Sequence, residues 1–338
     1  MKTIFKSFIY GMVALSMLTV TTSCNDEWED EQYAQYISFR APLNDQGITA
    51  VYVPFTRKNS DGTNKYGPGI SNYQLPVIVS GSTHNSATRV VNFKHDPDTL
   101  DALNWARFAT RTELYYKDMN PYCTFPSTLT IPKGEDVGLL DIKIDFNNLD
   151  LVDKWIFPIT VAEGDGYVPN PRKNYKKAML RIFPFNDYSG DYSATGLTIA
   201  VTGDQNSTGL TWLRTYVVDD NTVFFYAGRF DESNPQRGKY KIYAQFNGDT
   251  SGTIKMWTDN PEMNLVINKD ASFRMVESED QTYPYLLYRN VIINNIDYSF
   301  DDYTSLKGSK FSYTVSGTLT LQRTINTQIP DEDQAIQW

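Results

Sequence analysis

Apolar and polar residues alternate with a period of two along residues 139–146, where charged residues separate Leu140, Ile142 and Ile144. This alternation predicts a β-strand with one buried and one solvated face, because successive side chains point to opposite sides of a strand. Short apolar runs bounded by Gly, Pro, Asn and Asp predict further strands at residues 48–55, 74–79, 155–161 and 178–183. About seven short strands in about 150 residues indicate a β-sandwich.

The β pattern continues beyond residue 190 with longer hairpins. Residues 211–218 and 222–229 flank the triplet 219–221, Asp-Asp-Asn, which predicts a tight hairpin turn. Further strands are predicted at residues 239–246, 253–258, 272–276, 285–293, 296–300 and 311–323. Strands with this up-and-down spacing predict a β-barrel or a strongly curled sheet.

One segment breaks the β pattern. Asp98 or Thr99 can cap a helix that carries Leu100 and Leu103 on one face and extends to about residue 114. This helix is the only one that the pattern predicts in the first half.

The turn-rich segment 184–190 follows a complete strand and marks a domain boundary. We therefore expect a sandwich domain at residues 36–184 and a barrel domain at residues 185–338. The chain is long enough for two domains of ordinary size.

The N-terminus has the zones of an export signal. Lys2 and Lys6 precede an apolar run at residues 8–20, which is shorter than the roughly 20 apolar residues that cross a bilayer. The small residues 21–23 then lead directly into Cys24. This arrangement is typical of a bacterial lipoprotein signal at residues 1–23, with a diacylglyceryl group on the thiol of Cys24. The alternative is an ordinary cleaved signal followed by an incidental cysteine.

An acidic cluster at residues 26–31 follows the predicted lipid site. Such a stretch cannot bury itself, so residues 24–35 are predicted to form a solvated tether. The cluster resembles the surface-export signal of Bacteroidetes lipoproteins, which implies an outer-membrane location facing the cell exterior. A plain acidic linker on a periplasm-facing lipoprotein is the alternative.

The charge balance excludes one class of partner. The sequence has 31 basic and 40 acidic residues, and removal of Lys2 and Lys6 with the signal changes the net charge from −9 to −11. Nucleic-acid binding requires basic surface and is not expected. The same balance argues against polyanionic glycans as a general target, although a local basic groove would override the average.

The sequence offers little catalytic chemistry. Cys123 is the sole cysteine besides Cys24, and we interpret it as a buried small hydrophobe rather than a nucleophile. The two histidines, His84 and His95, have no zinc-ligand spacing, and no Gly-x-Ser-x-Gly elbow supports a triad. With 40 acidic residues, carboxylate pairs exist by number alone, so no catalytic residue is assigned. No cofactor or metal is predicted.

Two Asp-rich stretches, at residues 96–101 and 297–302, could hold calcium through oxygen ligands. Neither has the spaced acidic loop of a calcium-binding motif, so turn and cap roles are the preferred interpretation.

Four stretches resemble a known family. Residues 128–134 (TLTIPKG) and 155–161 (WIFPITV) are similar to the Ig-like N-terminal domain of Bacteroidetes surface lipoproteins. Residues 221–228 (NTVFFYAG) and 321–334 (LQRTINTQIPDEDQ) are similar to the lipocalin-like C-terminal domain often paired with it. The resemblance implies an Ig-like β-sandwich followed by a lipocalin-like β-barrel, in a glycan-utilisation lipoprotein with a carbohydrate-binding or adhesive role. The family carries no motif that assigns catalytic residues.

A sugar-binding site needs an aromatic ring to stack on a pyranose and polar groups to orient its hydroxyls. The chain is rich in aromatics, with 23 Tyr, 18 Phe and 6 Trp. The candidate ligand-binding residues are Trp105 on the predicted helix, Trp212 and Trp257 in predicted barrel strands, and Tyr283 and Tyr285. For each of these residues a role in the core remains the alternative.

The resulting functional prediction is a non-catalytic surface lipoprotein that binds an oligosaccharide or polysaccharide and acts beside other outer-membrane glycan-uptake proteins. The membrane is contacted through the lipid anchor only. A protein-binding adhesin or structural surface subunit is the alternative, and a glycoside hydrolase is less favoured.

Overall fold

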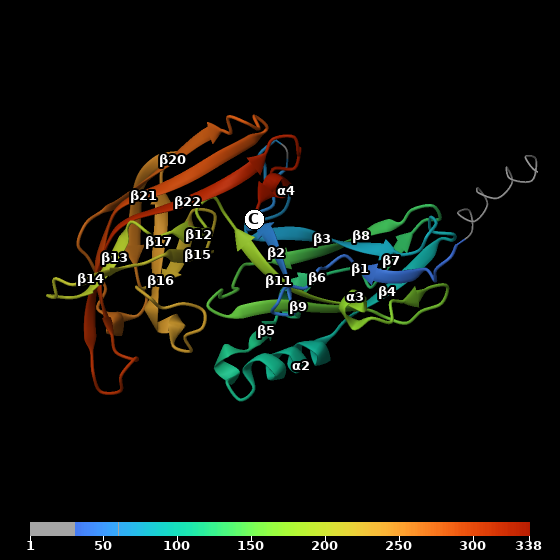
Figure 1. Cartoon of the computed structure of the whole chain (residues 1–338), viewed down its shortest axis with the longest axis horizontal. Helices are drawn as coiled ribbons and strands as arrows, with labels where there is room; N and C mark the ends of the chain where they lie inside the picture. Colours follow the sequence, from blue (N-terminus) through green and yellow to red (C-terminus); the bar gives the residue numbers. More distant parts are fainter. Residues whose placement is uncertain (1–30, 60) are drawn as a thin grey trace, which may run out of the picture.

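The computed structural model describes residues 31–59 and 61–338. Cys24, the predicted signal and most of the predicted tether lie outside the described residues. The described chain forms two β domains that lie side by side, with the segment after the last long strand between them (Figure 1). The prediction of a mainly β protein, with a sandwich followed by a barrel, is confirmed. Within the described ranges, the helices are all too short or too polar to span a bilayer.

The N-terminal domain is a sandwich of two sheets. One sheet has the order β10-β1-β3-β8-β6, and the other has the order β2-β11-β9-β4-β7 with β5 beside β9. The first comprises β1 (Tyr36–Phe39), β3 (Ile70–Val79), β6 (Cys123–Thr124), β8 (Val137–Asp145) and β10 (Val168–Pro169). The second comprises β2 (Thr49–Pro54), β4 (Arg89–His95), β5 (Tyr116–Asp118), β7 (Thr128–Ile131), β9 (Lys154–Val161) and β11 (Lys177–Phe185).

The alternation seen in the sequence accounts for the sandwich core. Leu140, Ile142 and Ile144 of β8 are fully buried, and the charged residues between them are exposed. Phe157 and Ile159 of β9 face them from the second sheet in the same core cluster. Burial of each such apolar side chain contributes about 1.5–3 kcal/mol, which makes this core the main source of stability in the absence of disulfides.

Helix α2 (Pro97–Phe108) differs at both ends from the predicted helix. It begins at Pro97, because proline is preorganised for the first helical position, and Asp96 occupies the N-cap. It ends at Phe108, since Ala109 adopts a positive φ of 48°, and a separate 3-10 turn η1 follows at Thr112–Leu114. Leu100 packs on one end of the outer face of the second sheet, in a cluster that also contains Ile48, Ile156 and Met179. The part of this outer face around Phe183 is not covered by α2 and faces the barrel instead.

The C-terminal domain is a closed barrel of eight strands, in the order β22-β12-β15-β16-β17-β18-β20-β21, closed by pairing of β21 with β22. Strand β13 continues β12 along β22 and carries β14 at its edge. The bounds are β12 (Gly190–Ser193), β13 (Leu197–Val201), β14 (Ser207–Gly209), β15 (Trp212–Val217), β16 (Thr222–Tyr226), β17 (Lys241–Asn247), β18 (Ser251–Trp257), β19 (Val266–Ile267), β20 (Ala271–Glu279), β21 (Leu286–Asp302), β22 (Phe311–Asn326) and β23 (Ile336–Gln337).

Two predicted barrel strands, at 285–293 and 296–300, are a single strand in the structure. Strand β21 runs through both and has a β-bulge between Ile293 and Ile296. Asn295 lies in the bulge with φ 58°, a conformation that asparagine tolerates better than most residues. The Asn pair that separates the two apolar runs therefore bends a strand rather than ending it.

The barrel interior is a packed core. Tyr192, Tyr240 and Tyr298 are fully buried, together with Phe246 and Phe300. The buried hydroxyls are paired: Tyr298 accepts the backbone N–H of Gly228 at 3.2 Å, and Tyr240 donates to the Asp302 carboxylate at 2.8 Å.

The remaining short helices are η2 (Asn120–Tyr122), α3 (Lys173–Lys176), η3 (Arg237–Tyr240), η4 (Pro261–Met263) and α4 (Glu332–Ala335).

The sandwich and the barrel are joined by a short connection and by polar contacts. Strand β11 ends at Phe185 and β12 begins at Gly190, and the Arg323 guanidinium donates to the carbonyls of Asn186 and Ser189 between them. Arg237 also donates through Nε to the carbonyl of Val152 at 2.8 Å. These contacts hold the barrel against the outer face of the second sandwich sheet.

The end of the predicted 24–35 tether contacts the sandwich. The Glu31 carboxylate accepts hydrogen bonds from the backbone N–H groups of Ser82 and Thr83, at 2.7 and 3.1 Å, and from both hydroxyls. The Ser82 backbone N–H is the largest cause that holds the pKa of Glu31 far below its ordinary value. Residues 31–35 therefore do not behave as a free tether, because the Ser/Thr loop supplies donors for the carboxylate.

Candidate binding pocket between the two domains

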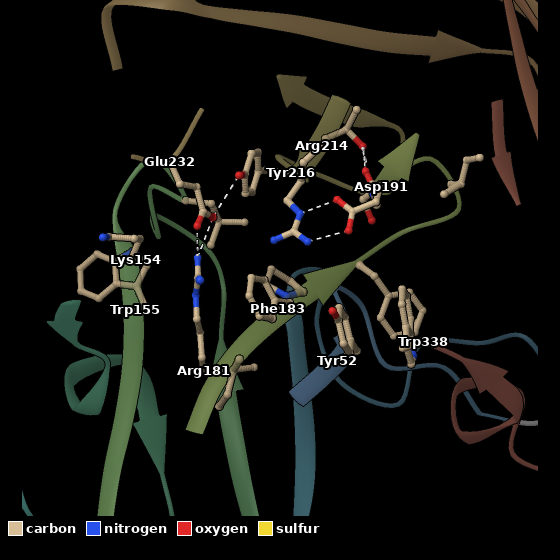
Figure 2. Close-up of a pocket in the computed structure, with 18 of the residues that line it drawn as sticks. Tyr52, Lys154, Trp155, Arg181, Phe183, Asp191, Arg214, Tyr216, Glu232 and Trp338 are labelled. Carbon is tan, nitrogen blue, oxygen red and sulfur yellow. Dashed lines mark hydrogen bonds and ion pairs between the residues drawn. The ribbon is translucent and has the colours of Figure 1, made fainter. Parts of the chain in front are cut away.

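The pocket forms where the outer face of the second sandwich sheet meets the barrel. Side chains alternate along β11, so Leu180 and Ile182 enter the sandwich core while Arg181 and Phe183 point outward. Barrel strands β12 and β15 lie over this outward face, and a cavity of about 200 Å³ remains between the domains (Figure 2). Neither domain alone contains the complete wall.

Aromatic rings form one side of the pocket. The rings of Phe183 and Tyr52 are stacked at 5.3 Å, and those of Tyr52 and Trp338 at 4.2 Å with only 5° between their planes. Phe185 closes the row against Trp338 at 4.7 Å. Trp338 keeps 50% of its surface exposed, so it is the member of the row that offers apolar area to a bound molecule.

An ion pair between the domains forms a second side. Nη2 of Arg181 donates to both carboxylate oxygens of Glu232, at 2.6 and 2.7 Å, and the Tyr216 hydroxyl donates to the same carboxylate at 3.0 Å (Figure 2). Burial alone would raise the pKa of Glu232, but the charge and hydrogen bonds of Arg181, with contributions from Arg214 and Tyr216, together lower it. Glu232 is therefore an anion at neutral pH.

A second guanidinium lies above the aromatic row. Arg214 makes a bidentate pair with Asp191, through Nε at 2.5 Å and Nη2 at 2.6 Å, and lies 5.7 Å from the ring centroid of Phe183. The hydrogen bond to Asp191 raises the pKa of Arg214. The paired planar groups hold their positions without a ligand, which is the preorganisation that a binding site requires.

A lysine forms the third side, beside Trp155 at the start of β9. Lys154 is only 7% exposed, and its ammonium lies 4.2 Å from the ring centroid of Phe108 and 5.0 Å from that of Tyr116. Burial, together with the charges of nearby guanidinium groups, lowers the pKa of Lys154 to about 8. The Trp155 indole donates to the carbonyl of Asp150 at 2.8 Å and is thereby fixed.

The arrangement suits binding better than acid–base catalysis. A glycosidase general acid must be protonated near neutral pH, whereas Glu232 is held as an anion by Arg181. The other pocket carboxylates are also paired, Asp191 with Arg214 and Asp153 with Lys117. Within residues 31–59 and 61–338, no group of three or more His, Cys, Asp or Glu side chains could hold a metal ion.

The structure places the five sequence-predicted ligand-binding residues outside this pocket. Trp105 on α2 and Trp212 in β15 are exposed, at 63% and 54%, and Trp257 in β18 stacks on Tyr243 at 5.2 Å. The remaining two, Tyr283 and Tyr285, lie in the β20–β21 loop with ring centroids 5.9 Å apart and are the only close pair in the set. A sugar-stacking role for each of the five stays a prediction.

The residues that line the pocket were missed by sequence reasoning. In the apolar run 178–183, Arg181 interrupts the pattern on the side opposite Leu180 and Ile182. Arg181 and Phe183 therefore lie on the face of the strand that points away from the core. A cation beside an aromatic ring on such a face indicates a candidate binding surface. That signal alone could not name Glu232 or Trp338, which come from distant parts of the chain.

Other sequence candidates have roles within the fold. Asp96 pairs with Lys177 at 2.7 Å, and Asp301 pairs with Lys310 at 2.8 Å, so both Asp-rich stretches hold structural contacts. His84 and His95 pair with Asp136 and Asp118, each at 2.6 Å. Burial, together with the charge of Asp118, raises the pKa of the half-buried Cys123 thiol to about 12.

A second cavity of about 440 Å³ lies at one mouth of the barrel. Phe230, Phe300 and Tyr313 line it, with Arg229 donating to the Thr208 hydroxyl at its rim. The Asp302 carboxylate at this cavity already accepts from Tyr240 and from nearby backbone N–H groups.

Comparisons with known proteins identify relatives that match both domains of the chain. Residues 28–165 match the family model of DUF4973, a domain of unknown function, and residues 176–320 match a model of a C-terminal domain. The chain is similar to an auxiliary nutrient binding protein from Bacteroides thetaiotaomicron, with 48% identity and a TM-score of 0.83 over 90% of this chain and 100% of that one. No curated protein matches the sequence.

Two Bacteroides ovatus structures are also similar over most of their length. One is a multidomain protein that includes DUF1735, with 38% identity and a TM-score of 0.78 over 90% of this chain and 100% of that one. The other is a protein of unknown function, with 34% identity and a TM-score of 0.76 over 92% of this chain and 97% of that one.

Proposed function

Because the chain belongs to the family of two-domain Bacteroides proteins that includes this auxiliary nutrient binding protein, we propose that it is a non-catalytic carbohydrate-binding protein. The interdomain pocket is the proposed site, and an oligosaccharide or a segment of a polysaccharide is the proposed ligand. The observation that carries the proposal is the stacked row of Phe183, Tyr52 and Trp338 beside preorganised guanidinium groups.

The two halves of the pocket match the two surfaces of a sugar. A pyranose has an apolar C–H face, which the aromatic row can cover, and a rim of hydroxyls that needs charged or polar partners. Arg181 and Arg214 lie over the Phe183 ring, 4.5 and 5.7 Å from its centroid, so the polar groups stand at one end of the row and the exposed Trp338 at the other. The cavity is smaller than the roughly 300–1,000 Å³ of pockets for drug-sized ligands, which favours capture of a short portion of a chain.

The cellular setting is proposed from the sequence. A lipid on Cys24 would tether the protein to the outer membrane, and the acidic residues after it favour display on the cell exterior. Capture of a glycan there would serve other outer-membrane uptake proteins. Mass spectrometry of the membrane form tests the lipid on Cys24, and protease treatment of intact cells tests display on the cell exterior. An unmodified Cys24 thiol, or protection from the protease, would contradict them.

Binding is tested with a broad glycan array followed by calorimetry on each hit. We expect Trp338→Ala to weaken binding at least about tenfold, corresponding to about 1.4 kcal/mol of lost stacking. Trp105→Ala is the control, because it removes an exposed indole that is not among the residues lining the pocket, and it is expected to leave the affinity of this pocket unchanged.

Two results would contradict this proposal. Absence of binding across neutral and acidic glycans would refute carbohydrate capture, and recovery of a stable protein partner would then favour the adhesin alternative. Loss of binding in Trp105→Ala but not in Trp338→Ala would place the site outside the interdomain pocket.

A further inference from the structure

Positive charge is concentrated at one end of the interdomain pocket, in a protein whose net charge is −9. Lys154 of β9 faces Arg107 of α2, Arg181 of β11 and Arg237 of η3, and each of these guanidinium groups lowers the pKa of its ammonium. The acid that opposes them is Glu232. Lys154, Arg181 and Glu232 line the pocket, whereas Arg107 is exposed on α2 and Arg237 donates to the carbonyl of Val152.

Lys154 is the cation in this cluster with the least compensation. Its ammonium is buried against the rings of Phe108 and Tyr116, and among the described residues no carboxylate is paired with it. The neighbouring acid Asp153 is engaged by Lys117 at 2.5 Å. A buried ammonium without an acid partner destabilises the protein by itself, so its presence in a pocket wall indicates a role in binding.

The other pocket cations have less capacity for an additional anion. Arg214 is neutralised by its bidentate pair with Asp191. Arg323 donates to two backbone carbonyls at the domain connection, and Asp187 lies 4.0 Å from it. Arg181 is likewise paired with Glu232, so the unbalanced positive charge in the pocket wall is that of Lys154.

We infer that the sugar captured in this pocket carries a negatively charged group, a carboxylate or a sulfate ester, which is received by Lys154 at the end of the pocket that Arg181 also lines. This inference rests on the proposed carbohydrate binding and names the chemical class of the ligand. A bound anion supplies the counter-charge that the buried Lys154 ammonium lacks and accepts charge-assisted hydrogen bonds from it. The aromatic row then positions the rest of the sugar.

The same geometry makes binding dependent on pH. An anionic ligand favours the charged form of Lys154 and raises its pKa above the value of about 8 in the free protein. Affinity for the acidic sugar therefore falls as the pH rises from 7 to 9.5, on the order of tenfold, because the free ammonium loses its proton. Lys154→Arg keeps a charge that does not titrate in this range, and it removes the drop.

The experiment uses a glycan array with neutral, uronate-containing and sulfated members, followed by calorimetry of each hit at pH 7 and 9.5. We expect hits among the acidic members, with at least tenfold weaker binding in Lys154→Gln and substantial rescue in Lys154→Arg. Lys255→Gln is the control, because Lys255 is an exposed lysine of β18 outside the pocket. Hits limited to uronates identify a carboxylate, and hits limited to sulfated glycans identify a sulfate ester.

The outcomes separate this inference from the proposed function. Binding of neutral glycans only, or acidic-glycan binding that Lys154→Gln leaves unchanged, overturns the inference while carbohydrate capture stands. No binding to any member refutes the proposed function and the inference together. Lys154→Gln removes a buried cation, so the variant is expected to fold, and circular dichroism verifies this.

Discussion

Arg181 of the sandwich and Glu232 of the barrel are joined across the domain boundary by hydrogen bonds of 2.6 and 2.7 Å. Both side chains are largely buried, at 10% and 22% exposure. The pair therefore serves two purposes: it fixes the barrel on the outer face of the second sandwich sheet, and it sets the charge of the pocket between them.

Loss of the Glu232 carboxylate should destabilise the protein. Glu232→Gln leaves the buried guanidinium of Arg181 without its anion, and we expect the free energy of unfolding to fall by about 3 kcal/mol. Asp191→Asn is the matched comparison, since it breaks a pair whose acid is more than half exposed, and it should cost under about 1 kcal/mol. Urea denaturation of both variants measures the difference. Equal losses would contradict a buried, coupling role for Glu232.

The same pair should become weaker in acid. The pKa of Glu232 in the folded protein lies below its ordinary value of 4.5, because Arg181, Arg214 and Tyr216 together outweigh the effect of burial. The stabilisation is therefore complete above about pH 4.5 and is lost as the pH falls through the lower folded pKa. We expect the stability difference between wild type and Glu232→Gln to be constant from pH 7 to 5 and to shrink below that range. A difference that grows on acidification would contradict the assigned direction.

The architecture could be predicted from the sequence because it follows from local alternation. Leu140, Ile142 and Ile144 identify their strand without reference to any other segment. The errors arose where one residue changed the local geometry: Pro97 moved the start of the helix, and Asn295 turned two predicted strands into one bulged strand. The exact ends of a helix and the position of a bulge depend on backbone conformation, which the pattern of apolar and polar residues does not predict.

The site could not be predicted in the same way, because its parts come from both domains. Tyr52 and Arg181 lie in neighbouring sandwich strands, Glu232 follows a barrel strand, and Trp338 returns to the sandwich after the barrel is complete. Their proximity depends on how the barrel docks, which no local pattern encodes. The aromatic candidates named from the sequence, such as Trp105, lie outside this pocket, and their role in binding stays a prediction.

Cys123 should be nearly unreactive in the folded protein. Burial and the charge of Asp118 raise the pKa of its thiol from 9.0 to about 12, so the thiolate is scarce at pH 8. In a chain beginning at residue 25, which contains no other cysteine, we expect labelling by a disulfide reagent to be roughly 100- to 1,000-fold slower than in urea. Rapid labelling of the native chain would show that the thiol is accessible, and it would favour a role for Cys123 as a nucleophile.

Gly317 should be essential to the corner at which β12 passes into β13 along β22. Its φ is 138°, and a Cβ added there would lie 1.9 Å from the backbone oxygen of Gly196. Gly317→Ala must therefore displace backbone, and we expect a loss of about 3 kcal/mol in the free energy of unfolding. Gly209→Ala is the control, because an added Cβ meets no atom within 4 Å. A thermal shift that is the same for both variants would contradict the close approach.

The ligand-free protein should become more stable in alkali through Lys154. Its pKa falls from 10.5 in the unfolded chain to about 8 in the folded protein, mainly because of burial. The unfolded state therefore binds more protons between these values, and the free energy of unfolding rises as the pH increases from 8 to 10. A difference of one bound proton changes the free energy of unfolding by about 1.4 kcal/mol per pH unit. Over this range the free energy of unfolding of wild type should therefore rise by about 2 kcal/mol relative to that of Lys154→Met, as measured by urea denaturation. Lys255→Met, which removes an exposed lysine, should show no such divergence from wild type. If wild type and Lys154→Met follow the same pH profile, then Lys154 titrates as an ordinary lysine, and the buried positive charge assigned to the pocket is absent.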